Sequence, residues 1–203
     1  EPGASDEPDE AVDWRLFVRD VLSSVFAVAL VGVYLFAVSG VWPPLVAIES
    51  PSMVPNMQIN DLVFVMEEQR FAGEDARHGV VTAHTGETTN YDKFGRPGDV
   101  IVFERNGQSE ETPIIHRAMF WVSEGENWYD EADPDFVGGA SSCEALANCP
   151  APHAGFITKG DGNSNYDQAG PGVLSGPVRP EWVVGTAELR IPGLGWIRLT
   201  STG

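Results

Sequence analysis

A run of 21 residues without a charged side chain, from Val21 to Val41, constrains this chain more than any other feature. As a helix, the run would be roughly 31 Å long, which is close to the thickness of the hydrocarbon core of a bilayer. Trp14 and Trp42 bracket it, as aromatic side chains do at membrane interfaces. We therefore expect a transmembrane signal anchor over residues 14–42.

The basic residues around this run predict its orientation. Arg15 and Arg19 precede it, whereas the next basic residue after it is Arg70. The positive-inside rule then predicts a cytoplasmic N-terminus and an extracellular domain on a single-pass protein of the cell membrane. A buried core helix is an alternative that the length of the run disfavours. A cleaved secretory signal, with small residues at 37–39, is a second alternative, but its apolar region is typically only about 7–15 residues long.

The charge balance is strongly acidic, with 30 acidic against 12 basic residues and a formal net charge of −18. A negative field of this size opposes nucleic-acid binding, because phosphates need cationic partners. The acidic residues are spread along the chain and few of the basic residues are lysines, which is typical of proteins kept soluble in concentrated salt. We expect a halophile's surface; an acidic mesophilic protein is the alternative.

Residues 1–13 are acidic and offer little to bury, so we expect a disordered tail there. The chain does not begin with methionine, and we expect it to be trimmed. The last apolar run, at 191–196, is too short to span a membrane.

After Pro43-Pro44 the pattern predicts a mainly β domain over residues 43–203. Short apolar runs bounded by Gly, Pro, Asn or Asp are typical of strands, and helical periodicity is scarce outside the anchor. The predicted strands cover 62–66, 100–103, 114–122, 155–158, 182–186 and 197–199. This pattern favours an antiparallel sheet, which two acidic insertions or long loops interrupt at about 67–96 and 123–154.

The two cysteines, Cys143 and Cys149, are separated by five residues. They lack the second pair of ligands that a structural zinc site requires, so we expect no metal and no cofactor. A small disulfide loop outside the cell and two unconnected thiols are both open.

A stretch rich in serine and proline, residues 50–55, follows shortly after the apolar run. It is a poor helix former and an awkward strand, but it can hold the Ser52 hydroxyl in a fixed place just outside a membrane. A serine nucleophile needs a base within hydrogen-bond reach. His116 is the strongest candidate, because it lies inside an apolar run whereas the other three histidines lie in polar insertions. A core histidine bonded to a backbone carbonyl is the alternative.

A third segment, residues 158–167, combines turn formers with two carboxylates, Asp161 and Asp167. A carboxylate near His116 would orient the imidazole and stabilise its protonated form. Lys159 is an alternative base, provided that burial makes it lose its proton. A plain hairpin loop is the alternative without function.

Four motifs therefore occur in order behind a single anchor: Ser-Pro-Ser-Met-Val-Pro at 50–55, Gly-Asp-Val-Ile-Val-Phe at 98–103, Ile-His-Arg at 115–117 and Thr-Lys-Gly-Asp-Gly-Asn at 158–163. Together they resemble the type I signal peptidases, membrane-anchored serine endopeptidases that remove signal peptides from exported preproteins. The bacterial branch carries a lysine just before the arginine. Here His116 stands there, so the chain is similar to the archaeal and endoplasmic-reticulum branch, and its acidity suggests a halophilic archaeon.

The resemblance covers residues 20–66, 96–122 and 155–190 and implies an antiparallel β catalytic domain of the signal-peptidase type. It implies that Ser52 is the nucleophile, that His116 is the general base and that Asp167, supported by Asp161, orients the base. Ser50 and the Ser52 amide would stabilise the oxyanion. The family pattern has asparagine where this chain has Gly162, so the geometry of that turn is open.

The partners that the resemblance implies are preprotein signal peptides, membrane lipid and nearby protein-export machinery. Two other functions stay open. The chain would be a membrane-anchored β domain that serves as a binding or assembly subunit without catalysis, or a related membrane serine protease with other substrates.

Overall fold

The computed structural model describes residues 14–196 of the chain, which divides into two compact units, Glu1–Val38 and Ser39–Gly203. The α-helix α1 (Trp14–Ser39) has 26 residues and is therefore about 39 Å long. Its most apolar window has a mean hydropathy of 2.5 and no buried residue, so the helix is long and apolar enough to cross a membrane. The expectation of one apolar N-terminal helix is confirmed. The tail expected at 1–13 and the strand expected at 197–199 lie outside the described residues.

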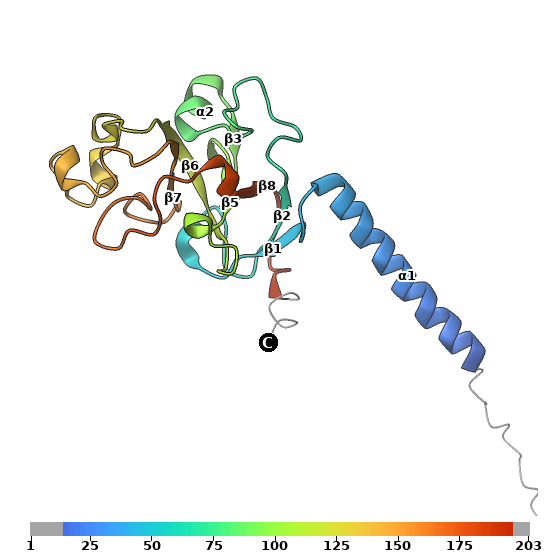
Figure 1. Ribbon diagram of the computed structural model, residues 1–203. Helices are drawn as coiled ribbons and strands as arrows, with labels where there is room; N and C mark the ends of the chain where they lie inside the picture. Colours follow the sequence, from blue (N-terminus) through green and yellow to red (C-terminus); the bar gives the residue numbers. More distant parts are fainter. Residues whose placement is uncertain (1–13, 197–203) are drawn as a thin grey trace, which may run out of the picture. The chain divides into compact units, whose positions relative to one another are not determined.

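The second unit is built on a six-stranded sheet with strand order β1-β2-β8-β5-β6-β7 (Figure 1). Every pair of neighbouring strands in it is antiparallel, which confirms the expected mainly β, antiparallel class. The strands are β1 (Leu45–Ala47), β2 (Leu62–Met66), β5 (Val100–Phe103), β6 (Ile114–Val122), β7 (Gly155–Lys159) and β8 (Val183–Ile191). A separate hairpin pairs β3 (Asp92–Lys93) with β4 (Arg96–Pro97), and single 3₁₀ turns span Pro51–Met53, Arg105–Gly107, Trp128–Asp130, Pro134–Phe136, Cys143–Ala145 and Pro180–Trp182.

The structure contains elements that the sequence pattern did not indicate. One is β1, and another is the helix α2 (Ala83–Thr89), which lies inside the first acidic insertion. The side chain of Thr82 caps this helix by accepting a hydrogen bond from the Thr85 backbone N–H, and Asn90 ends it in the left-handed conformation. Seven residues are too few for a helical hydrophobic period to emerge, so α2 was missed.

Every residue of β5 is buried, because side chains pack on both faces of the sheet around it. Val100 and Val102 belong to one cluster together with Met53. Ile101 and Phe103 belong to another cluster, which also contains Ala118, Phe156 and Val178. Alternate residues of a strand point to opposite faces, so the central strand supports a core on either side.

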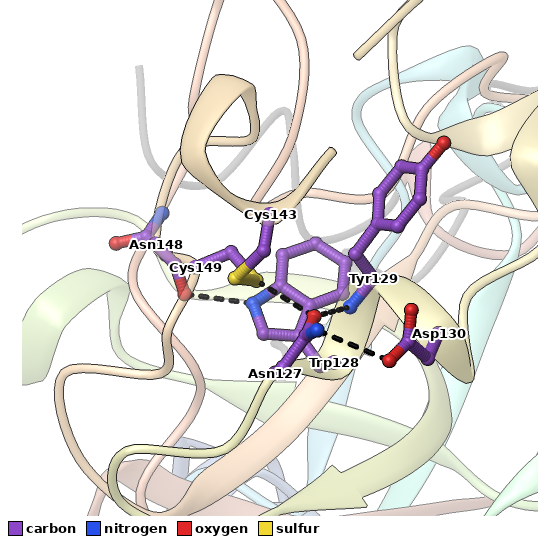
Figure 2. The surroundings of a disulfide bond; sticks show 7 residues. All are labelled: Asn127, Trp128, Tyr129, Asp130, Cys143, Asn148 and Cys149. Carbon is purple, nitrogen blue, oxygen red and sulfur yellow. Dashed lines mark hydrogen bonds between the residues drawn. A yellow bond between two sulfur atoms is a disulfide. The ribbon is translucent and has the colours of Figure 1, made fainter. Parts of the chain in front are cut away.

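The second insertion, residues 123–154, contains no α-helix or strand among the residues described, but it is packed. Trp128 is fully buried and belongs to a cluster with Phe120 and Tyr166. Its indole Nε1 donates to the backbone oxygen of Asn148 at 2.7 Å, beside the disulfide between Cys143 and Cys149 (Figure 2). The two cysteines are therefore joined rather than free.

Candidate active site

Ser52 lies in the middle of the 3₁₀ turn Pro51–Met53. Proline suits the start of such a turn, because its φ angle is already fixed and its missing N–H is not needed there. Met53 is fully buried in the core cluster beside β5, whereas Ser52 stays partly exposed. The sequence thus fixes the turn by an apolar side chain and leaves the neighbouring hydroxyl accessible.

The loop after β7 packs directly against this turn. The Gly162 backbone N–H donates to the Ser52 carbonyl oxygen at 2.8 Å. A Cβ atom at Gly162 would lie 2.7 Å from the Val54 carbonyl oxygen, and one at Gly160 would lie 2.6 Å from the Ser52 carbonyl oxygen. Real Cβ atoms do not approach so closely, so glycine at both positions lets the two backbones meet. Glycine at position 162, whose turn geometry the sequence left open, therefore fits the close approach of the two backbones.

His116 and Asp167 form a buried pair, each about 4% exposed. His116 lies on β6, and its Nδ1 is 2.7 Å from Asp167 Oδ2. An ionised carboxylate only accepts hydrogen bonds, so opposite such a group Nδ1 is the donor, and the neutral form of the imidazole would then have its lone pair on Nε2. Asp167 itself is tied to β7, because its backbone N–H donates to the Thr158 carbonyl oxygen at 2.9 Å.

Ser50, Ser52 and His116 line one cavity of about 700 Å³. Its apolar lining comes from several strands and the segments beside them, and includes Val46, Val65, Val102, Ile115 and Val184. Ser52 Oγ lies 3.1 Å from Ser50 Oγ. Within residues 14–196, Ser52 Oγ forms this hydrogen bond and none to His116, so the direct contact that we expected is not made. Catalytic hydrogen bonds often tighten only when a substrate is bound.

Asp161 does not face His116 but forms a buried ion pair with Arg117. Arg117 Nε and Nη2 each donate to one Asp161 carboxylate oxygen at 2.8 Å, and both side chains are 2% exposed. Burial alone would raise the pKa of Asp161, but the hydrogen bonds and charge of Arg117 outweigh it and hold the pKa below its ordinary value. Asn56 Nδ2 donates to Asp161 Oδ2 at 2.8 Å, which links the carboxylate to the segment after the Ser52 turn.

The remaining bonds of Arg117 go to backbone oxygens around the β3–β4 hairpin. Its Nη1 lies within hydrogen-bond distance of four carbonyl oxygens, the shortest being that of Gly98 at 2.6 Å. Arg117 therefore joins the hairpin to the loop that carries Asp161.

Lys159 lines a different cavity from Ser52, a smaller one of about 240 Å³ that it shares with Phe136 and Asp161. Its Nζ donates to the Gly160 carbonyl oxygen at 3.1 Å and lies 4.3 Å from the centre of the Phe136 ring. Burial lowers the pKa of Lys159, and the nearby charge of Arg96 lowers it further. This placement does not support Lys159 as the base for Ser52.

The other histidines lie away from the pair. His84 contacts Glu131, His78 lies tilted against the Trp121 ring, and His153 meets the Trp182 ring edge to face. In the described part of the chain, no cluster of three or more His, Cys, Asp and Glu side chains could hold a metal ion.

Sequence reasoning missed the polar side chains that hold the two carboxylates. Asn56 binds Asp161, and the Thr158 hydroxyl donates to Asp167 at 2.7 Å. Gln168 is fully buried and binds Thr158. The adjacency of Gln168 to Asp167 was a weak signal, and Asn56 carried none, because it meets Asp161 only in the folded chain.

Among known proteins, no family model and no curated protein matches this chain.

Proposed function

We propose that this protein is a membrane-bound serine endopeptidase, a signal peptidase that removes signal peptides from exported preproteins. The observation that carries the proposal is the buried His116–Asp167 pair at a cavity that Ser52 also lines. The substrate class rests on the four ordered motifs that resemble type I signal peptidases. The buried ion pair of Asp161 adds support, because it fixes the loop on which the Ser52 turn rests.

The mechanism is acyl transfer. Ser52 Oγ attacks the carbonyl carbon of the scissile bond while His116 Nε2 takes its proton. Asp167 holds the imidazole in the tautomer with hydrogen on Nδ1 and stabilises the imidazolium that forms. His116 then gives the proton to the leaving amine, and a water molecule releases the cleaved signal peptide from the acyl-enzyme.

The negative oxygen of the tetrahedral intermediate requires hydrogen-bond donors. The Ser50 hydroxyl is one candidate, since it lies 3.1 Å from Ser52 Oγ and lines the same cavity. The backbone N–H of Ser52 is the other. Both donors belong to the same short segment as the nucleophile, so they keep their positions relative to it.

The substrate binds as an extended strand. β1 forms one edge of the six-stranded sheet, and its residues Val46 and Ala47 line the cavity. An edge strand offers unpaired backbone groups to an extended peptide, while an apolar floor accepts small side chains. Small residues at the first and third positions before the cut match such a floor.

Localisation follows from the same proposal. α1 anchors the chain in the cell membrane with the N-terminus in the cytoplasm, as the basic residues before the apolar run suggest. The disulfide in the second unit supports a position outside the cytoplasm, where thiols are not kept reduced.

The test is cleavage of a reporter preprotein in high salt by the full chain, with the products identified by mass spectrometry. We expect the wild type to cleave the preprotein and Ser52→Ala and His116→Gln to be inactive. The control Ser123→Ala should cleave like the wild type, because Ser123 is exposed and lies outside the cavity. Full activity of Ser52→Ala refutes the proposal. Loss in Lys159→Ala with retention in His116→Gln indicates a Ser–Lys dyad instead. A folded wild type that binds the preprotein without cutting it indicates a binding subunit.

A further inference from the structure

The Asp167 carboxylate receives two hydrogen bonds on the same oxygen. Oδ2 lies 2.7 Å from His116 Nδ1 and also 2.7 Å from Thr158 Oγ1. Thr158 is fully buried on β7 and its side chain lies on the face of the sheet that His116 also occupies, as the pairing of Ala118 with Thr158 requires. The carboxylate is thus held from β7 and from β6 at once.

Gln168 sets the direction of these hydrogen bonds. The Thr158 backbone N–H can only donate, and it lies 2.9 Å from Gln168 Oε1. The amide nitrogen Nε2 must then face the Thr158 hydroxyl at 3.2 Å, to which it donates. The hydroxyl therefore accepts from Gln168, and its single hydrogen is left for Asp167.

Gln168 is itself held on several sides. Its Nε2 also lies 3.1 Å from Ser175 Oγ and 3.1 Å from the Gly176 carbonyl oxygen. Its backbone oxygen accepts from Asn148 Nδ2 at 3.1 Å, and Asn148 lies in the loop that the disulfide closes (Figure 2). A fully buried amide with so many partners has one orientation available to it.

We infer that Thr158 and Gln168 are positioning residues, which hold the Asp167 carboxylate directed at His116. The inference rests on the proposed function, since it assigns the two residues to the reaction at Ser52. Loss of the hydroxyl would leave Oδ2 with one donor instead of two and allow the carboxylate to turn. Hydrogen bonds to charged groups are stronger than those between neutral groups, so loss of this one should matter. We expect it to lower kcat, because proton transfer from Ser52 needs the His116 imidazole held in one orientation.

The test compares Thr158→Val, which keeps the shape and removes the hydroxyl, with Thr158→Ser, which keeps the hydroxyl. Thr186→Val is the matched control, because Thr186 is also a buried strand threonine that donates to a carboxylate, at 2.8 Å, but this carboxylate belongs to Glu188 and not to Asp167. We expect Thr158→Val to lower kcat for the reporter preprotein by about 10- to 100-fold with KM changed less than about threefold. Thr158→Ser and Thr186→Val should keep kcat near the wild-type value.

A wild-type kcat in Thr158→Val, or a kcat equally low in Thr158→Ser, overturns the inference, because the hydroxyl would then be dispensable or insufficient. Thermal unfolding of each variant shows whether it folds. If Thr158→Val does not fold, the kcat of Thr158→Ala, which also lacks the hydroxyl, is compared with that of Thr158→Ser. If the wild type cleaves the preprotein and Thr158→Val has the same kcat, the inference is wrong but the proposed function stands. A wild type no more active than Ser52→Ala refutes the proposed function, and the inference with it.

Discussion

Replacement of Asp161 by asparagine removes one charge from the most buried ion pair beside the candidate site. Arg117 donates to both carboxylate oxygens at 2.8 Å, and both side chains are 2% exposed. Asparagine has nearly the same shape, but it carries no charge, and its amide nitrogen donates where the carboxylate oxygen accepted. One Arg117 donor therefore meets another donor, and the guanidinium charge stays buried without its counter-charge.

The expected cost is large. Removal of one partner of a buried ion pair costs about 3–5 kcal/mol, because the other charge is left uncompensated. Arg117 Nη1 keeps its carbonyl acceptors around the β3–β4 hairpin, the nearest at 2.6 Å, so part of the charge remains stabilised. We therefore expect the lower end, about 3 kcal/mol, which is roughly a 100-fold change in the folding equilibrium.

The measurement is denaturant unfolding of the full chain in detergent and high salt, followed by near-ultraviolet circular dichroism. Asp75→Asn is the matched control, since Asp75 is exposed, and its effect should stay within about 0.5 kcal/mol. An Asp161→Asn variant within about 1 kcal/mol of the wild type would show that the charge pair contributes little and that the loop is held by other contacts.

Three further outcomes follow from the same geometry. The pKa of Asp161 is lowered in the folded state, so its charge stabilises the fold above about pH 4, and this contribution is lost as the pH falls through the folded-state pKa. The difference in free energy of unfolding between wild type and Asp161→Asn should therefore be smaller at about pH 3 than at about pH 7. A larger difference at the lower pH would contradict this. Asp167→Asn should lower kcat for the reporter preprotein by about 10³- to 10⁴-fold, because an amide does not hold the required His116 tautomer, and more than a tenth of wild-type activity in a folded variant would contradict it. The double variant Cys143→Ser/Cys149→Ser should lower the free energy of unfolding by about 2 kcal/mol, as expected for a short closed loop, whereas a reductant should destabilise the wild type and leave the double variant unchanged.

The strands that are best predicted from the sequence are those that are buried on both faces and therefore form a continuous apolar run. β5, at Val100–Phe103, follows a Gly-Asp turn signal and is buried on both faces, so its run of four apolar residues is unbroken. β1 has three residues and directly follows two prolines, which left too short a pattern to recognise. α2 depends on its Thr82 cap and on packing against β6, and neither is visible as a hydrophobic period.

The packed state of residues 123–154 was beyond sequence reasoning for a related reason. The segment reads as acidic loop, yet Trp128 and Leu146 are buried against side chains that the sheet and the loop after β7 supply. The partners of these two residues are distant in sequence, so no local period indicates the burial. The disulfide was one of two open alternatives, because spacing alone does not distinguish a closed loop from two thiols.

The choice between the two carboxylates illustrates what strand register adds to sequence spacing. His116 and Arg117 are neighbours on β6, so their side chains point to opposite faces of the sheet. On β7, Thr158 pairs with Ala118 and Lys159 pairs with Arg117, which places Thr158 on the face of His116 and Lys159 on the face of Arg117. Asp167 therefore binds His116 and Thr158 on one face, whereas Asp161 binds Arg117 on the other. A shift of one residue in this register would exchange the two faces, bringing Lys159 instead of Thr158 to the side of His116, so the assignment of carboxylates depends on a pairing that the sequence does not state.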